Sequence, residues 1–92
     1  MRAICTKVAA HLPHAEPGLD EKPWLTYWNY ITAVAARADA SGGRALVDLQ
    51  VPVYDLGSNL SGTDLINART ALIDSLNRLN RKCLAVGSHV VQ

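Results

Sequence analysis

Two runs with apolar residues at alternate positions dominate the centre of the chain. The run at residues 24–32 places Trp24, Trp28 and Tyr30 on one side of an extended chain. The run at residues 45–55 alternates more regularly and offers one unbroken apolar face: Ala45, Val47, Leu49, Val51 and Val53. Residues 41–43, Ser-Gly-Gly, supply a turn between the runs because glycine tolerates positive φ. The pattern therefore predicts a β-hairpin that holds both tryptophans and all three tyrosines.

Helical spacing predicts an element on each side of this hairpin. Residues 2–12 repeat apolar positions every three or four residues, and Pro13 ends the predicted helix. Residues 14–22 are predicted to form a loop. A second, longer helix is predicted from Ser61, its N-cap, to about residue 81, with an apolar stripe of Leu65, Ala68, Leu72, Leu76 and Leu79. The tail at residues 83–91 resembles one more strand, or two short strands.

Together these elements predict one α+β domain over residues 1–92. We expect an antiparallel sheet with a long central hairpin, packed against one main C-terminal helix plus a short N-terminal helix. Residues 33–38 could be helical by propensity, but we expect them to form the end of the first strand. Pro52 lacks an N–H group, so the second strand should be unpaired or bulged there. This strand edge could bind a neighbouring subunit, or it could simply be a protected edge, and the sequence favours neither.

Composition narrows the classes of partner. The chain has 92 residues, about half of them apolar, and a formal charge of +1, so a basic nucleic-acid surface is not expected. No apolar run is long enough to cross a bilayer, and the N-terminus does not read as a signal peptide. We therefore expect a cytoplasmic protein. Cys5 and Cys83 could form a disulfide, but two reduced, mostly buried thiols are the favoured interpretation.

The polar residues predict neither a metal site nor an active site. The possible metal ligands lack the close spacing of zinc sites: Cys5, His11, His14, Cys83 and His89. No serine lies in a nucleophile elbow and no phosphate-binding loop is present, so neither an enzyme nor a cofactor is expected. Trp24, Trp28 and Tyr30 could form an aromatic ledge for a ligand, although large aromatic residues in a small domain more often belong to the core.

Three segments, taken in order, resemble the tail terminator (tail completion) proteins of long-tailed bacteriophages. Pro23-Trp24-Leu25-Thr26-Tyr27 matches the opening of the family's first strand, and residues 47–55 match its second strand, with Tyr54 at the usual tryptophan position. Residues 67–72 match the helix that follows. The chain is shorter than typical members, and Pro52 interrupts the second strand.

The resemblance implies a structural virion protein that is assembled in the host bacterial cytoplasm. Such proteins form a hexameric ring that ends polymerisation of the tail tube, so the partners would be copies of the chain, the tail tube protein and the head–tail connector protein. Exposure and opposite charges suggest contacts of the ring at these residues: Arg37, Asp39, Arg44, Pro52, Asp55 and Asn59. Two alternatives stay open, namely another neck or head–tail connector protein, and a cytosolic binding module with an aromatic sheet face.

Overall fold

Four helices build the computed structural model, which describes residues 2–14, 20–58, 60–88 and 90. They are α1 (Arg2–His11), α2 (Lys22–Arg37), α3 (Ala40–Leu56) and α4 (Gly62–Ala85). The predicted helices at residues 2–12 and 61–81 are confirmed, and α4 continues to Ala85. The predicted α+β fold is wrong, because the described residues contain no strand and both halves of the expected hairpin are helical.

The burial pattern explains why the two central runs are helices. In α2 the buried residues Trp24, Tyr27 and Ile31 are three and four positions apart, which is the spacing of one helix face. Val47 and Val51 belong to the expected apolar strand face, yet both side chains are more than half exposed. The buried positions of α3 instead follow the helical period: Ala45, Leu46, Leu49, Val53 and Leu56. Alternation was present in the sequence, but the helical period decided the fold.

The chain reverses direction between α2 and α3 earlier than the glycines suggest. Residues 41–43 lie inside the first turns of α3, and the reversal occurs at Ala38 and Asp39, both with extended backbone. The Asp39 carboxylate accepts a hydrogen bond of 2.8 Å from the Gly42 N–H and so caps α3. Gly42 also permits a close approach, since a Cβ there would collide with the side chain of Ile4 in α1.

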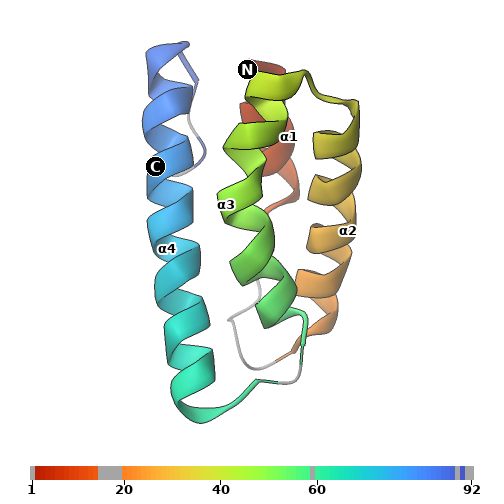
Figure 1. The fold of residues 1–92 in the computed structure, drawn as a ribbon, viewed down its shortest axis with the longest axis vertical. Coiled ribbons are helices and arrows are strands. Elements are labelled where there is room, and N and C mark those ends of the chain that lie inside the picture. The colour runs from red at the N-terminus through yellow and green to blue at the C-terminus, as the bar shows by residue number, and fades with distance from the viewer. Residues whose placement is uncertain (1, 15–19, 59, 89, 91–92) are drawn as a thin grey trace.

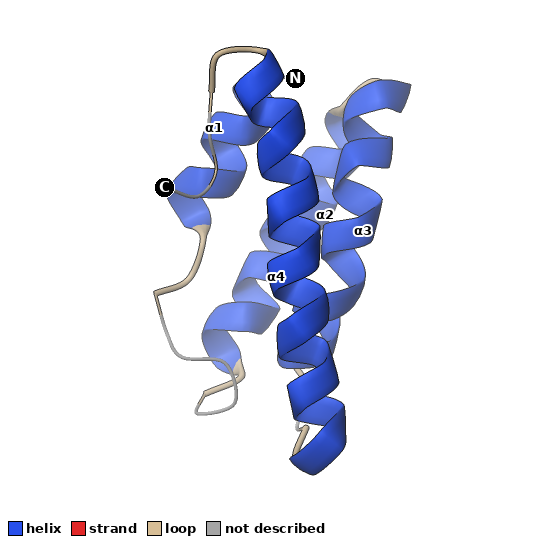
Figure 2. Cartoon of the chain, turned by 90° about the vertical axis from the view of Figure 1, so that its left-hand side faces the viewer, coloured by secondary structure: helices blue, strands red, loops and turns tan. Residues whose placement is uncertain are grey.

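The helices α2, α3 and α4 lie side by side, with α3 in the middle (Figure 1). The view from the side shows α1 and α3 on opposite sides of the molecule (Figure 2). Residues from all four helices form one apolar cluster, in which Val8, Ile31, Leu46 and Cys83 are fully buried. One side of α3 faces this core and the other faces away from the remaining helices.

A disulfide bond between Cys5 and Cys83 joins α1 to the end of α4. The expectation of two reduced thiols is therefore wrong, although both cysteines are buried as predicted. Arg2 adds a second connection, since its guanidinium donates hydrogen bonds of 3.1 and 2.7 Å to the carbonyl oxygen of Val86. A cation at the carboxyl end of a helix is favoured by the helix dipole. The first helix is thus held against the last.

Aromatic residues of α2 hold the other end of α1. The buried Tyr27 hydroxyl donates a 2.9 Å hydrogen bond to the carbonyl oxygen of Val8. His11 stacks on Tyr30 with ring centroids 3.8 Å apart. The contacts fix α1 between α2 and α4, on the side of the molecule away from the outer side of α3.

Removing the disulfide should strongly lower the free energy of unfolding. The bond joins residues 78 positions apart, and closure of a loop of this size stabilises a fold by about 4–5 kcal/mol in the chain-entropy model. We expect a loss of this order for the double variant Cys5→Ala/Cys83→Ala, measured by urea unfolding. Alkylation of the unfolded, unreduced protein should add no label by mass spectrometry, and two labels would contradict the bond.

The stability of the fold should fall in alkaline solution because of Tyr27. Burial, followed by the nearby Tyr30, raises the pKa of the Tyr27 hydroxyl well above its usual value. Above pH about 10 the unfolded chain loses this proton while the folded chain keeps it, so the free energy of unfolding decreases as pH rises. Urea unfolding over this range should show a flatter pH dependence for Tyr27→Phe, and an unchanged slope would contradict the assignment.

Candidate functional site

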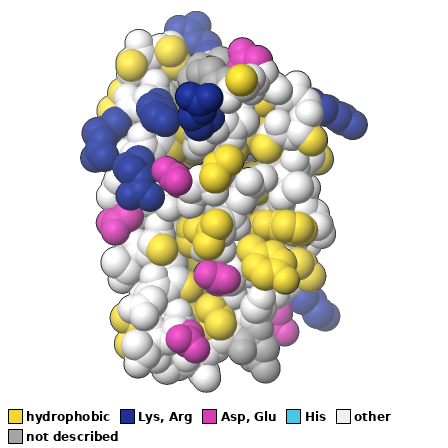
Figure 3. Space-filling model, in the orientation of Figure 1, with side chains coloured by type: hydrophobic (Ala, Val, Ile, Leu, Met, Phe, Trp, Pro, Cys, Tyr) yellow, Lys and Arg dark blue, Asp and Glu magenta, His cyan; other side chains and the backbone are white. Residues whose placement is uncertain are grey.

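An exposed apolar surface lies on the outer side of α3. Val47, Val51 and Tyr54 are 53%, 63% and 51% exposed, and their spacing of four and three residues places them on one helix face. We call this surface, together with Arg44, Asp48 and Asp55, the outer α3 face. Figure 3 shows hydrophobic side chains gathered over the middle of the molecule, where α3 lies in the same orientation. No other helix of the described chain covers it.

An aromatic groove continues this face toward α2. The rings of Trp28 and Tyr54 meet edge to face, with centroids 5.2 Å apart. They belong to an open pocket of about 340 Å³ whose lining is Trp28, Thr32, Gln50, Val51 and Tyr54. The Thr32 hydroxyl oxygen is buried and has no hydrogen-bond partner in the described part of the chain. The groove is therefore mostly apolar, with one unused polar atom.

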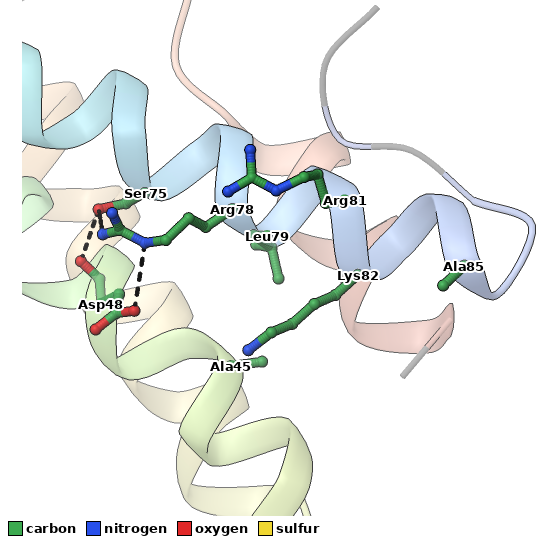
Figure 4. A pocket seen from close by; sticks show the side chains of 8 residues that line it. All are labelled: Ala45, Asp48, Ser75, Arg78, Leu79, Arg81, Lys82 and Ala85. Atoms are coloured by element: carbon green, nitrogen blue, oxygen red, sulfur yellow. Dashed lines mark hydrogen bonds and ion pairs between the residues drawn. The ribbon is translucent and has the colours of Figure 1, made fainter.

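A basic pocket of about 390 Å³ borders the outer α3 face on the other side, toward the end of α4. Its lining is Ala45, Asp48, Ser75, Arg78, Leu79, Arg81, Lys82 and Ala85. Figure 4 shows the Arg78 side chain reaching toward Asp48 and Ser75, and the Lys82 side chain extending toward Ala45. Arg78 Nε lies 3.6 Å from Asp48 Oδ2, and both side chains are at least half exposed, so this ion pair stabilises the fold little.

An acidic pocket of about 400 Å³ occupies the opposite end of the groove between α3 and α4. Its lining is Asp55, Leu60, Asp64, Asn67, Ala68 and Ala71. This pocket has two carboxylates, Asp55 and Asp64, where the basic pocket has three cations. The groove is thus basic beside the first half of α3 and acidic beside its last turn.

Ser75 repairs a break in α3 that Pro52 causes. A helical residue at position 52 would donate its N–H to the carbonyl oxygen of Asp48, but proline has no N–H group. The Ser75 hydroxyl, from α4, lies 3.0 Å from this carbonyl oxygen and 2.7 Å from that of Ala71. Ser75 is buried, and Arg78 donates to its hydroxyl oxygen at 3.4 Å. The two helices are therefore joined at the middle of α3.

The residues predicted as contacts between subunits do not form one cluster. Arg37 ends α2 and is exposed, while Asp39 is occupied in capping α3. Pro52 was predicted to mark an open strand edge, but it is buried inside α3. Asn59 lies outside the described residues.

Arg44 and Asp55 do share a surface. Both lie on the outer α3 face, where the Arg44 side chain is exposed and that of Asp55 is half-buried. They stand at opposite ends of the exposed apolar residues. The sequence pattern therefore identified the two charged ends of this face but not its apolar centre.

The predicted aromatic ledge is absent because its three members point in different directions. Trp24 is buried in the core, Tyr30 stacks on His11, and Trp28 contacts Tyr54. A helix turns by about 100° per residue, so residues that alternate on a strand separate on a helix. The aromatic sheet face proposed as a ligand site is therefore wrong.

The candidate metal ligands are dispersed or engaged elsewhere. Cys5 and Cys83 are bonded to each other, His11 stacks on Tyr30, and His14 is exposed after α1. His89 lies outside the described residues. Over the described positions, no three histidine, cysteine or acidic side chains come together as a metal site would require.

Sequence reasoning missed Val47, Val51 and Tyr54 as surface residues. The signal that could have found them is their spacing of four and three positions, on the helix side opposite Leu46, Leu49 and Val53. The alternation of the same residues gave the competing strand interpretation.

Comparison with known proteins gave no match to a family model, to a curated protein or to a solved structure. Among the described residues, none of the helices combines the length and the apolar character needed to span a membrane.

The contact between Ser75 and the Asp48 carbonyl can be tested with a double-mutant cycle. Ser75→Ala should lower the free energy of unfolding by about 1–2 kcal/mol, because it leaves a part-buried carbonyl without a donor. In the Pro52→Ala background residue 52 regains an N–H for this carbonyl, so the same change should cost clearly less. Ser58→Ala, which removes only an exposed contact, is the matched control. Equal costs in both backgrounds would contradict the account.

Proposed function

We propose that this protein is a non-catalytic assembly module that binds copies of itself through the outer α3 face. The observation that carries the proposal is the exposure of Val47, Val51 and Tyr54 beside the aromatic groove. Contiguous exposed apolar surface rimmed by polar residues is typical of protein–protein interaction sites. Aromatic residues such as Trp28 and Tyr54 are enriched in the centres of such sites.

A second set of exposed apolar residues, on α4, is the natural competitor. Ile66, Ile73 and Leu84 are also more than half exposed and lie on one side of α4. They are seven and eleven positions apart, and polar residues such as Thr70 and Asn77 lie between them. The outer α3 face has apolar neighbours on consecutive turns and an adjoining groove, so it can bury more continuous apolar surface.

The size of the chain supports self-association. A domain of 92 residues buries a modest share of its surface, and burying more in an oligomer adds stability. The homo-oligomer inferred from the sequence is retained in this proposal. The two pockets between α3 and α4 are open rather than enclosed, and their charged residues would border the proposed interface.

A role in a phage tail neck stays a prediction from the sequence. The strand motifs behind it, Pro23–Tyr27 and residues 47–55, lie entirely within the helices α2 and α3, so the structure lends the phage role no support. The Cys5–Cys83 bond favours a final location outside the reducing cytosol, and disulfides persist in secreted proteins and on virion and cell surfaces alike. Of the functions implied by the family resemblance, we propose only the association of this chain with copies of itself.

Replacing Val51 with aspartate should abolish self-association without unfolding the chain. The side chain is 63% exposed, so a charge is tolerated in the monomer but would be buried unpaired in an interface. We expect light scattering coupled to size-exclusion chromatography to report a monomer for Val51→Asp and a larger species for the unchanged protein.

The matched control for this experiment is Ile73→Asp, at a position on α4 whose side chain is also more than half exposed. It should associate like the unchanged protein. Loss of association in Ile73→Asp but not in Val51→Asp would move the interaction surface to α4. A monomer at all concentrations for the unchanged protein would contradict the proposed function.

A further inference from the structure

The outer α3 face carries opposite charges at its two ends. Arg44 lies in the second turn of α3 and Asp55 in the last. They are eleven positions apart, which is about three helical turns, so they lie on the same side about 16 Å apart along the axis. Val47 and Val51 occupy the space between them and are both exposed. The apolar centre therefore has a cation at one end and an anion at the other.

The groove between α3 and α4 repeats this arrangement. The pocket near the start of α3 is lined by Arg78, Arg81 and Lys82, with Asp48 paired to Arg78, so it keeps an excess of cations. Asp55 and Asp64 line the pocket near the end of α3. Figure 3 shows most of the Lys and Arg side chains over the upper part of the molecule, whereas Asp and Glu side chains lie both among them and lower down. Both the outer α3 face and the adjoining groove therefore change from basic to acidic from the start of α3 to its end.

Such a surface is complementary to itself in one orientation. A two-fold axis perpendicular to α3 reverses the direction of the second helix, and this brings the basic end of each copy to the acidic end of the other. A parallel arrangement would instead place Arg44 beside the partner's Arg44. Like charges brought together in this way oppose association.

We propose that two copies pair through antiparallel α3 helices about a two-fold axis near the centre of the outer α3 face, with Arg44 opposite the partner's Asp55. The proposal rests on the proposed function and specifies its partner and geometry. In this register the Val47 and Val51 side chains of one copy pack at the centre of the interface, close to the same two side chains of the partner. Arg44 and Asp55 form two equivalent ion pairs at the rim.

This geometry also sets the number of copies. An isologous contact uses the same surface in both subunits and is complete with two copies, whereas a ring needs two different surfaces. The proposal is therefore a dimer. It departs in this respect from the hexameric ring that the family resemblance implies.

Charge reversal at the two rim positions gives a direct test. Arg44→Asp alone and Asp55→Arg alone each place like charges at both rim contacts. We expect each to weaken dimerisation by about tenfold in low salt, from the size of exposed ion pairs counted twice. Mixing the two variants restores both contacts, because the hybrid dimer pairs the introduced Asp with the introduced Arg and the native Arg with the native Asp.

Sedimentation velocity of each variant and of their equimolar mixture measures these effects. Lys7→Asp, a charge reversal on the exposed part of α1, is the matched control and should leave association unchanged. Circular dichroism of each variant should keep the helical signal of the unchanged protein. Restored dimerisation in the mixture, beyond that of either variant alone, is the result that the proposal predicts.

Three results would overturn the proposal in different ways. If Val51→Asp abolishes association but both charge reversals behave like Lys7→Asp, the outer α3 face is the interface and the antiparallel register is wrong. The register is also wrong if both variants are weakened and the mixture is no stronger than either. If the unchanged protein does not associate, the proposed function fails together with the register.

Discussion

The bond between Cys5 and Cys83 is the constraint on which the arrangement of the helices depends. It fastens the first helix to the end of the last, and Arg2 strengthens this connection through the Val86 carbonyl. With α1 held on the far side, the apolar faces of α2, α3 and α4 all turn toward one core. The outer α3 face is left uncovered as a result, since no helix of the described chain remains to pack against it.

A polar contact holds the middle of α3 against α4. Pro52 removes one backbone hydrogen bond, and the Ser75 hydroxyl reaches from α4 to the Asp48 carbonyl that is left free. The position of α3 against α4 is therefore set by a polar contact as well as by apolar packing. Val47 and Val51 lie on the turns beside this contact, so the surface proposed for association is presented by an anchored helix rather than by a loop.

The sequence predicted the outer helices better than the centre. The regions of α1 and α4 followed from helical spacing and from Pro13 and Ser61, which mark helix ends locally. In α3, by contrast, Val47 and Val51 alternate with Leu49 and Val53, a pattern that also suits a strand, and only tertiary burial separates the two interpretations. The bond between Cys5 and Cys83 depends on the fold, and from the sequence alone two reduced thiols were favoured, which is wrong. Arg44 and Asp55 were found as charged surface residues, but their common face required the helix.

The central claim is that the outer α3 face is where copies of this protein meet. Amide signals of the isotopically labelled, unchanged protein, recorded by NMR during serial dilution, test it most directly. The account predicts concentration-dependent shifts at Val47, Val51 and Tyr54, with Ile66 and Ile73 on α4 unaffected. Spectra that do not change on dilution, or changes confined to the exposed side of α4, would contradict it.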